Sequence, residues 1–234
     1  AITKYLIGTS KKWNGSTVFW QIDNEQKVRH GKIMLYDEVT GKRSKDSSSK
    51  AYINSVRSTL KIKGFNLKQC LFGLHLINET ETRTVAIAEG EKTAVIMSLF
   101  KPEYVWLATG SKQGFKYEML KPVKDYKIIA FPDKGEHNEW LDKSIELNGF
   151  GFDITVSPLL EDLEYPVGSD LADVFIDEVK SDFKHAREDK TQIDTVLTKT
   201  ENIALKLAKI NPSLRKLISE FDLTDNNGIP IMNY

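Results

Sequence analysis

Carboxylate side chains follow three of the short apolar runs in this sequence, where they could act together on a metal ion. They are Glu89 after the first run, Asp133 after the third, and Asp170 with Asp173 after the fourth. Clustered carboxylates repel one another, and a hard divalent cation such as Mg²⁺ relieves that repulsion while keeping water positions for phosphate oxygens. Such a site serves phosphoryl or nucleotidyl transfer. A single acid at a helix start is better explained as a cap or dipole partner, so the interpretation depends on all three positions.

From residue 85 onward, apolar strand patterns alternate with helical patterns, and this order must position the acids. The expected strands are 85–88, 104–108, 127–131 and 152–157, and the expected helices are 92–100, 117–121, 136–147 and one that opens after Gly168. Short strands separated by helices require a mostly parallel sheet with right-handed crossovers. The carboxyl ends of such strands share one edge, so acids far apart in sequence can converge there.

The preceding part of the chain has a different pattern, rich in strands and in positive charge. Residues 5–77 favour a meander of twisted strands, with alternation at 17–22 and a second strand at 28–36, and a short helix is expected around 51–60. Residues 1–70 hold 14 Lys and Arg against 5 Asp and Glu, a balance of +9, while the rest of the chain carries −9. A polyanion partner for the basic half is one interpretation, and two halves that pack on each other is the alternative.

Basic side chains interleaved with aromatic rings are typical of nucleic-acid surfaces, because cations neutralise phosphates and rings stack on bases. Trp13, Trp20 and Tyr36 lie among the lysines and arginines of this half. For any single residue, a lysine that solvates the outer face of a sheet is the simpler explanation. The candidates for nucleic-acid contact are Lys11, Lys12, Lys27, Arg29, Lys32 and Arg43.

The composition and the patterns together suggest a cytoplasmic protein of several parts. The 234 residues are 40% hydrophobic and 28% charged, which suits a folded core, and no apolar run approaches the ~20 residues of a membrane helix. The N-terminus lacks a signal-peptide pattern, and the single cysteine, Cys70, excludes a disulfide framework. The expected parts are a basic β-rich subdomain at 1–78, an α/β domain at 84–180, a helical hairpin at 190–222 and a tail at 223–234.

Several motifs in this order resemble the Toprim domain, the metal-binding fold of bacterial-type primases, topoisomerases and some nucleases. The motifs are Ala88-Glu89-Gly90-Glu91-Lys92-Thr93-Ala94, Ala108-Thr109-Gly110-Ser111, Ala130-Phe131-Pro132-Asp133 and Asp170-Leu171-Ala172-Asp173. The stretch from Ile7 to Tyr36 is similar to the basic subdomain before Toprim in bacterial primases, and Leu71-Phe72-Gly73-Leu74 to the joint between the two. The resemblance covers about residues 5–178 and is closest to primase-like proteins of phages and mobile elements.

The resemblance implies roles for individual residues. Glu89 would be the general base or acid at a reacting hydroxyl, Asp133 a ligand of Mg²⁺ or Mn²⁺, and Asp170, with Asp173, would complete the metal site. The implied activity is primer synthesis on a DNA template from nucleotides, with a replicative helicase as a further implied partner and with the basic subdomain holding the template.

The sequence departs from the Toprim pattern at Gly135, where the second aspartate of an Asp-x-Asp pair is expected. Glu136 or Glu139 could substitute for it, or the site could bind one metal weakly or none. A zinc-binding module, which usually precedes this architecture, is not found in these residues. Three alternatives to a primase-like enzyme therefore stay open: a non-catalytic DNA-binding module with a degenerate metal site, a Toprim nuclease, and an unrelated α/β protein.

Overall fold

The computed structural model describes residues 1–188 of the chain. Residues Ala1–Asp177 form one compact unit, and helix α6 (Leu171–Glu188) begins within it and ends in the next unit. The expected hairpin at 190–222 and the tail at 223–234 lie outside the described residues. Within the described part of the chain, no helix is long and apolar enough to cross a membrane.

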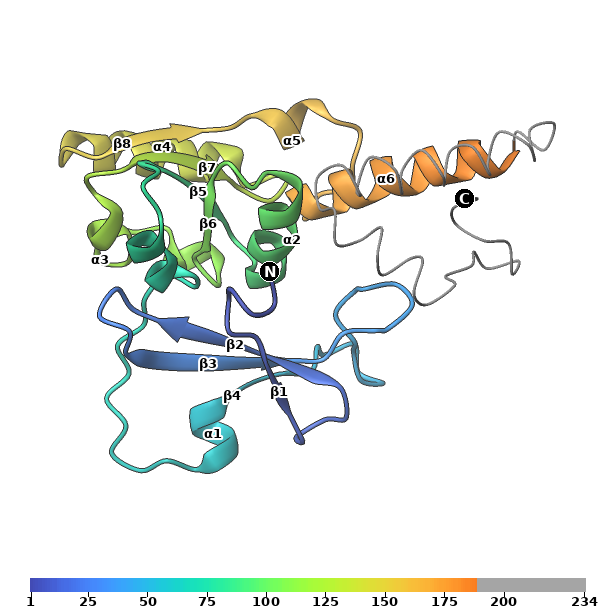
Figure 1. Ribbon diagram of the computed structural model, residues 1–234, viewed down its shortest axis with the longest axis horizontal. Helices are drawn as coiled ribbons and strands as arrows, with labels where there is room; N and C mark the ends of the chain where they lie inside the picture. The colour runs from blue at the N-terminus through green and yellow to red at the C-terminus, as the bar shows by residue number, and fades with distance from the viewer. Residues whose placement is uncertain (189–234) are drawn as a thin grey trace, which may run out of the picture. The chain divides into compact units, whose positions relative to one another are not determined.

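The N-terminal part of the compact unit is an antiparallel sheet in the strand order β1-β2-β3-β4 (Figure 1). Its strands are β1 (Gly8–Ser10), β2 (Ser16–Ile22), β3 (Val28–Met34) and β4 (Ile53–Ser55). The helix expected around 51–60 is too long, because Ile53 and Asn54 pair with β3 and the helix α1 occupies only Val56–Leu60. Ser55 caps α1 by accepting a hydrogen bond from the Ser58 amide. Up to Ser55 the chain therefore pairs with β3 and does not form a helix.

A parallel four-stranded sheet follows, and it has the strand order β6-β5-β7-β8. The strands are β5 (Thr84–Ala88), β6 (Val105–Ala108), β7 (Lys127–Phe131) and β8 (Asp153–Val156). The helices around and after them are η1 (Leu74–Glu79), α2 (Glu91–Phe100), η2 (Lys112–Gly114), α3 (Tyr117–Leu120), η3 (Lys121–Val123), α4 (His137–Gly149) and α5 (Leu159–Asp162). The expected fold class is confirmed: a basic antiparallel sheet precedes a parallel sheet flanked by helices.

The strand order fixes which strand ends can form a site. The chain leaves β5 toward β6 on one side, and it later leaves β7 toward β8 on the other side. Right-handed crossovers therefore place α2 and α4 on opposite faces of the sheet. The direction changes between the neighbouring strands β5 and β7, and a crevice opens at their carboxyl ends, the position where open α/β sheets bind ligands.

The two sheets are joined through residues 71–73 into one core. Phe72 and Ala108 exchange both backbone hydrogen bonds, so this segment adds a short antiparallel contact to the edge strand β6. Tyr5 stacks on Phe72 and donates its hydroxyl hydrogen to the Trp106 carbonyl oxygen at 2.8 Å. Gly73 has a φ of +80°, and a Cβ there would lie 3.0 Å from that same carbonyl oxygen, which explains a glycine at this joint.

Candidate active site

The crevice between β5 and β7 receives the two carboxylates that follow these strands. Ala88 and Phe131 are parallel partners in the register, so Glu89 and Asp133 come just after neighbouring strand ends. Both side chains line a cavity of about 520 Å³, which Asp170 and Asp173 at the start of α6 also line. This space is named the acidic cavity below, and it brings together the four acids that the sequence analysis placed after the apolar runs.

Burial and neighbouring charges raise the pKa of two acids of the cavity, Asp133 and Glu89. The pKa of Asp133 is raised from its ordinary value of 3.8 to about 8, first by removal from water and then by the charges of Glu89 and Asp170, against an opposing effect of Arg43. Burial also raises the pKa of Glu89, with Glu136 as the next cause, while Lys32 and Arg43 oppose the rise. Repulsion between close carboxylates in a partly dry site is the situation that a bound cation relieves.

Asp170 and Asp173 are held in place by the helix that they open. The Asp173 amide donates to Asp170 Oδ1 at 3.0 Å, and the Asp170 amide donates to Asp173 Oδ2 at 3.2 Å, which is a reciprocal cap of α6. The Thr93 hydroxyl in α2 donates to the other Asp170 oxygen at 2.8 Å. Asp170 is therefore both a helix cap and a wall of the acidic cavity, and Thr93 is a positioning residue that the sequence analysis missed.

The segment after β7 explains why a glycine replaces the second aspartate. Gly135 has a φ of +92°, and a Cβ at this position would lie 3.0 Å from Val167 Cγ1. The amide of Gly135 donates to Glu161 Oε1 at 2.7 Å, so the backbone is held in this conformation. An aspartate at this position would be strained.

Glu136 and Glu139, the two acids expected to substitute for the missing aspartate, are paired with lysines. Both carboxylates pair with Lys112, and Glu139 also pairs with Lys143 at 2.7 Å. Neither lines the acidic cavity, and Glu136 is the residue that precedes α4 rather than part of its first turn. Glu136 therefore acts on Glu89 through its charge and pairs with Lys112, and its role as a metal ligand stays a prediction.

The side chains of the acidic cavity include carboxylates of the kind that binds a divalent cation. The donors are carboxylates from three separate elements, which suits a hard cation such as Mg²⁺ or Mn²⁺. In residues 1–188, however, no group of three or more His, Cys, Asp or Glu side chains is arranged closely enough to hold a metal ion. The chemistry of the donors fits, and the metal ligands Asp133, Asp170 and Asp173 remain a prediction.

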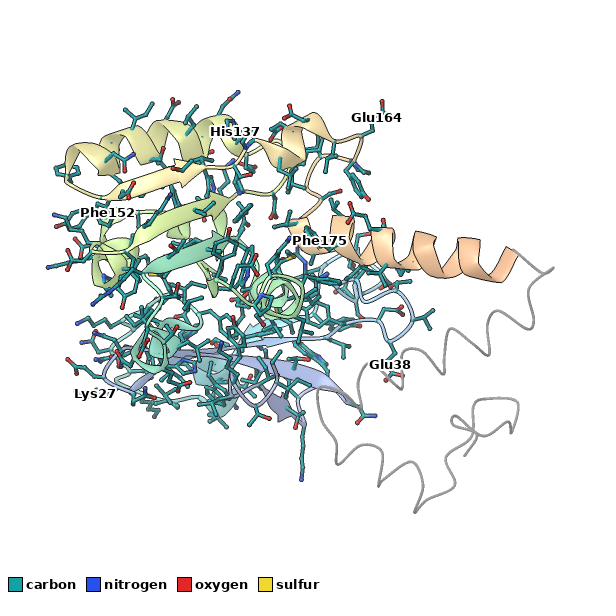
Figure 2. All side chains as sticks on the ribbon, turned by 45° about the horizontal axis from the view of Figure 1, so that its top comes forward. Lys27, Glu38, His137, Phe152, Glu164 and Phe175 are labelled. Carbon is teal, nitrogen blue, oxygen red and sulfur yellow. The ribbon has the colours of Figure 1, made fainter. Side chains whose placement is uncertain are left out.

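The six basic candidates do not form one surface. Lys11 and Lys12 lie in the turn between β1 and β2, whereas Lys27 and Arg29 lie at the turn end of the β2–β3 hairpin. Figure 2 shows Lys27 at this end of the hairpin. Lys27 pairs with Glu25 at 2.6 Å, and Arg29 pairs with Asp23, so both charges are balanced locally.

Lys32 and Arg43 are the two basic candidates that line the acidic cavity. Lys42 and Lys45, from the same loop as Arg43, line it as well, although the sequence analysis did not include them among the site residues. Their proximity to the acids depends on how the loop after β3 returns across the sheet, which no local pattern specifies.

Lys32 makes a partly buried ion pair that the sequence analysis did not anticipate. Its Nζ atom donates to both oxygens of Glu91 at 3.0 Å and to the Gly110 carbonyl oxygen at 2.7 Å. Glu91 is only 3% exposed. These three residues, named the Lys32 bridge, connect β3 with α2 and with the loop after β6, so the basic and acidic parts of the chain do pack on each other at this point.

The chain is similar in fold to several solved structures, and it matches the model of one protein family. No curated protein matches the sequence. The primase fragment of the bacteriophage T7 primase-helicase protein is 14% identical, with a TM-score of 0.48 over 79% of this chain and 68% of that chain. A DnaG catalytic core is 12% identical, with a TM-score of 0.49 over 99% of this chain and 86% of that chain. A DnaG primase catalytic domain bound to ssDNA is 13% identical, with a TM-score of 0.44 over 99% and 75% of the two chains.

These similarities concern the fold alone. The description of the fold given above rests on the strand order of this chain and does not depend on them. One protein-family model, described as "Domain of unknown function (DUF6371)", matches residues 1–134. Because this match spans more than half of the 234 residues, the chain belongs to the DUF6371 family.

Proposed function

We propose that this chain is a primase-like nucleotidyltransferase, which synthesises primers on a DNA template during replication of a phage-like or mobile element. The observation that carries the proposal is the meeting of Glu89, Asp133 and Asp170 in one cavity at the carboxyl ends of β5 and β7. The cavity also contains the cationic side chains of Arg43, Lys42 and Lys45, which suit phosphates of a nucleotide or a template.

Each acid has a distinct role in the proposed reaction. Glu89 is partly buried and its pKa is raised, so its carboxylate is suited to take a proton from the attacking hydroxyl. Asp133 and Asp170 would hold Mg²⁺ or Mn²⁺, which supplies charge compensation for phosphate oxygens when bound. Thr93 keeps the Asp170 carboxylate in position through its hydrogen bond.

The proposal is tested by primer synthesis on single-stranded templates with Mg²⁺ or Mn²⁺. Glu89→Gln keeps the size of the side chain and removes its ability to accept a proton, so we expect the rate to fall by about 10²- to 10⁴-fold. Exposed Asp142 in α4 lies away from the acidic cavity, and Asp142→Asn is the matched control that keeps wild-type activity. Wild-type protein that makes no product on any template would refute the enzymatic proposal.

The second candidate is a DNA-binding module without catalysis. The observation that favours it is the lack of three closely arranged ligands among residues 1–188, together with the glycine at position 135. This candidate predicts DNA binding that weakens steeply with salt, and no heat of Mg²⁺ or Mn²⁺ binding in calorimetry. Measurable Mn²⁺ binding that Asp133→Asn abolishes would exclude it.

A further inference from the structure

A second and larger cavity lies on the other side of the Lys32 bridge. It has a volume of about 720 Å³ and shares Lys32, Glu91 and Gly110 with the acidic cavity. Gln21 on β2 and His30 on β3 also line it. It is named the polar cavity below, and the proposed reaction uses none of the residues that line it alone.

Two side chains of the polar cavity have buried polar atoms that lack partners. Gln21 is 3% exposed, and its Oε1 atom has no hydrogen-bond partner among the described residues. Nδ1 of His30 is likewise buried and unpaired within residues 1–188. A buried polar atom without a partner destabilises a folded protein, so two of them on residues that line one cavity are candidates to pair with a ligand.

The sheet places these two groups next to each other. Gln21 and His30 are directly opposed residues of β2 and β3, beside the register shift between Gln21 and Ile22. A Cβ on Gly110 would lie 3.6 Å from Gln21 Nε2, which places the amide at the wall shared by the two cavities. Burial and the charge of Lys32 lower the pKa of His30, so its ring is neutral near neutral pH and can donate or accept a hydrogen bond.

We propose that the polar cavity binds an unpaired nucleobase, whose hydrogen-bonding edge pairs with the Gln21 amide and the His30 ring. A carboxamide presents one donor and one acceptor side by side, the pattern that matches the edge of a base. Met119 and Leu67 supply apolar surface for the faces of the ring, and the Lys116 ammonium supplies a partner for a phosphate. The proposal rests on the proposed function only in taking the ligand to be a nucleotide or part of a strand.

The test measures base selectivity without catalysis. Binding of labelled single strands of dA, dC or dT is followed by fluorescence anisotropy in the presence of a chelator, and binding of the four nucleoside monophosphates by calorimetry. We expect one base to bind about 5- to 150-fold more tightly than the poorest one. If only the single strands bind with different affinities, the bound base belongs to a strand. If the monophosphates also bind with different affinities, the bound base belongs to a free nucleotide.

A substitution then links the selectivity to the amide. Gln21→Met keeps the length of the side chain and removes both polar atoms, so the affinity ratio should fall toward one while the folded protein is as stable as before or more so. Gln26→Met is the matched control, because Gln26 is exposed in the β2–β3 turn and lines neither cavity.

A measurement on the wild-type protein keeps the test independent of that variant. The imidazole nitrogen resonances of His30 should shift when the preferred base is added. Equal affinity for all bases, an unchanged ratio in Gln21→Met, or silent His30 resonances would overturn the proposal. Because no transfer step is measured and the cation is chelated, these outcomes are separate from failure of primer synthesis.

Discussion

Replacing Asp133 by Asn should stabilise the protein at neutral pH and flatten its pH dependence. The pKa of Asp133 rises from 3.8 to about 8 on folding, so the native carboxyl keeps a proton that the unfolded chain has lost. Stability is therefore fully present below pH 3.8 and is lost as the pH rises through about 8. Asn has nearly the same shape and no charge, and it removes this dependence.

The magnitude follows from the width of that window. Each pH unit between the two pKa values lowers the free energy of unfolding by about 1.4 kcal/mol. From about pH 5 to about pH 7 the wild-type protein should lose about 3 kcal/mol that Asp133→Asn does not lose. Because Glu89, Asp170 and Asp173 all act on Asp133, the titration belongs to the cluster as a whole.

Urea unfolding of both proteins at these two pH values measures the difference. Asp142→Asn, at an exposed position of α4, controls for the loss of a carboxylate as such and should follow the wild-type curve. Parallel pH profiles of wild type and Asp133→Asn would show that the acids do not repel one another in the folded protein. That result would remove the electrostatic argument for a cation site.

Two further substitutions test the surroundings of the acidic cavity by urea unfolding. Lys32→Met leaves buried Glu91 without its cation and should cost about 3 kcal/mol, part of which Lys32→Met with Glu91→Gln restores. A loss below about 1 kcal/mol would contradict a structural role for the Lys32 bridge. Gly135→Asp places an aspartate at a φ of +92° beside Val167 and should cost about 1–2 kcal/mol without raising Mn²⁺ affinity. Tighter Mn²⁺ binding by this variant would show that the aspartate is accommodated and that the glycine only weakens a metal site.

The parallel sheet could be predicted because its strands carry continuous apolar runs. Strands buried on both faces have this pattern, and β7 occupies the expected range, Lys127–Phe131. Strands β1 and β4 have only three residues each, and pairing with distant partners rather than any local pattern creates them. Local sequence is a poor guide to such short pieces.

The acids of the site could be predicted from the positions of the strand ends, whereas the partners of the charged residues could not be predicted. Glu89 and Asp133 reach one cavity because parallel strands end at a common edge. Lys32 and Glu91 are 59 residues apart, so their ion pair depends on how the two sheets pack. Lys27 and Arg43 are separated because of the geometry of the β2–β3 hairpin. The number of basic residues in the sequence cannot predict this separation.

A crystal of the protein soaked in Mn²⁺ and measured for anomalous scattering tests the central claim most directly. The account predicts a Mn²⁺ peak in the acidic cavity at bonding distance from Asp133 and Asp170, with Glu89 close by. The same soak of Asp133→Asn should give no peak there. A wild-type crystal without a peak in this cavity, or with Mn²⁺ bound only elsewhere, would contradict a metal-dependent transfer site.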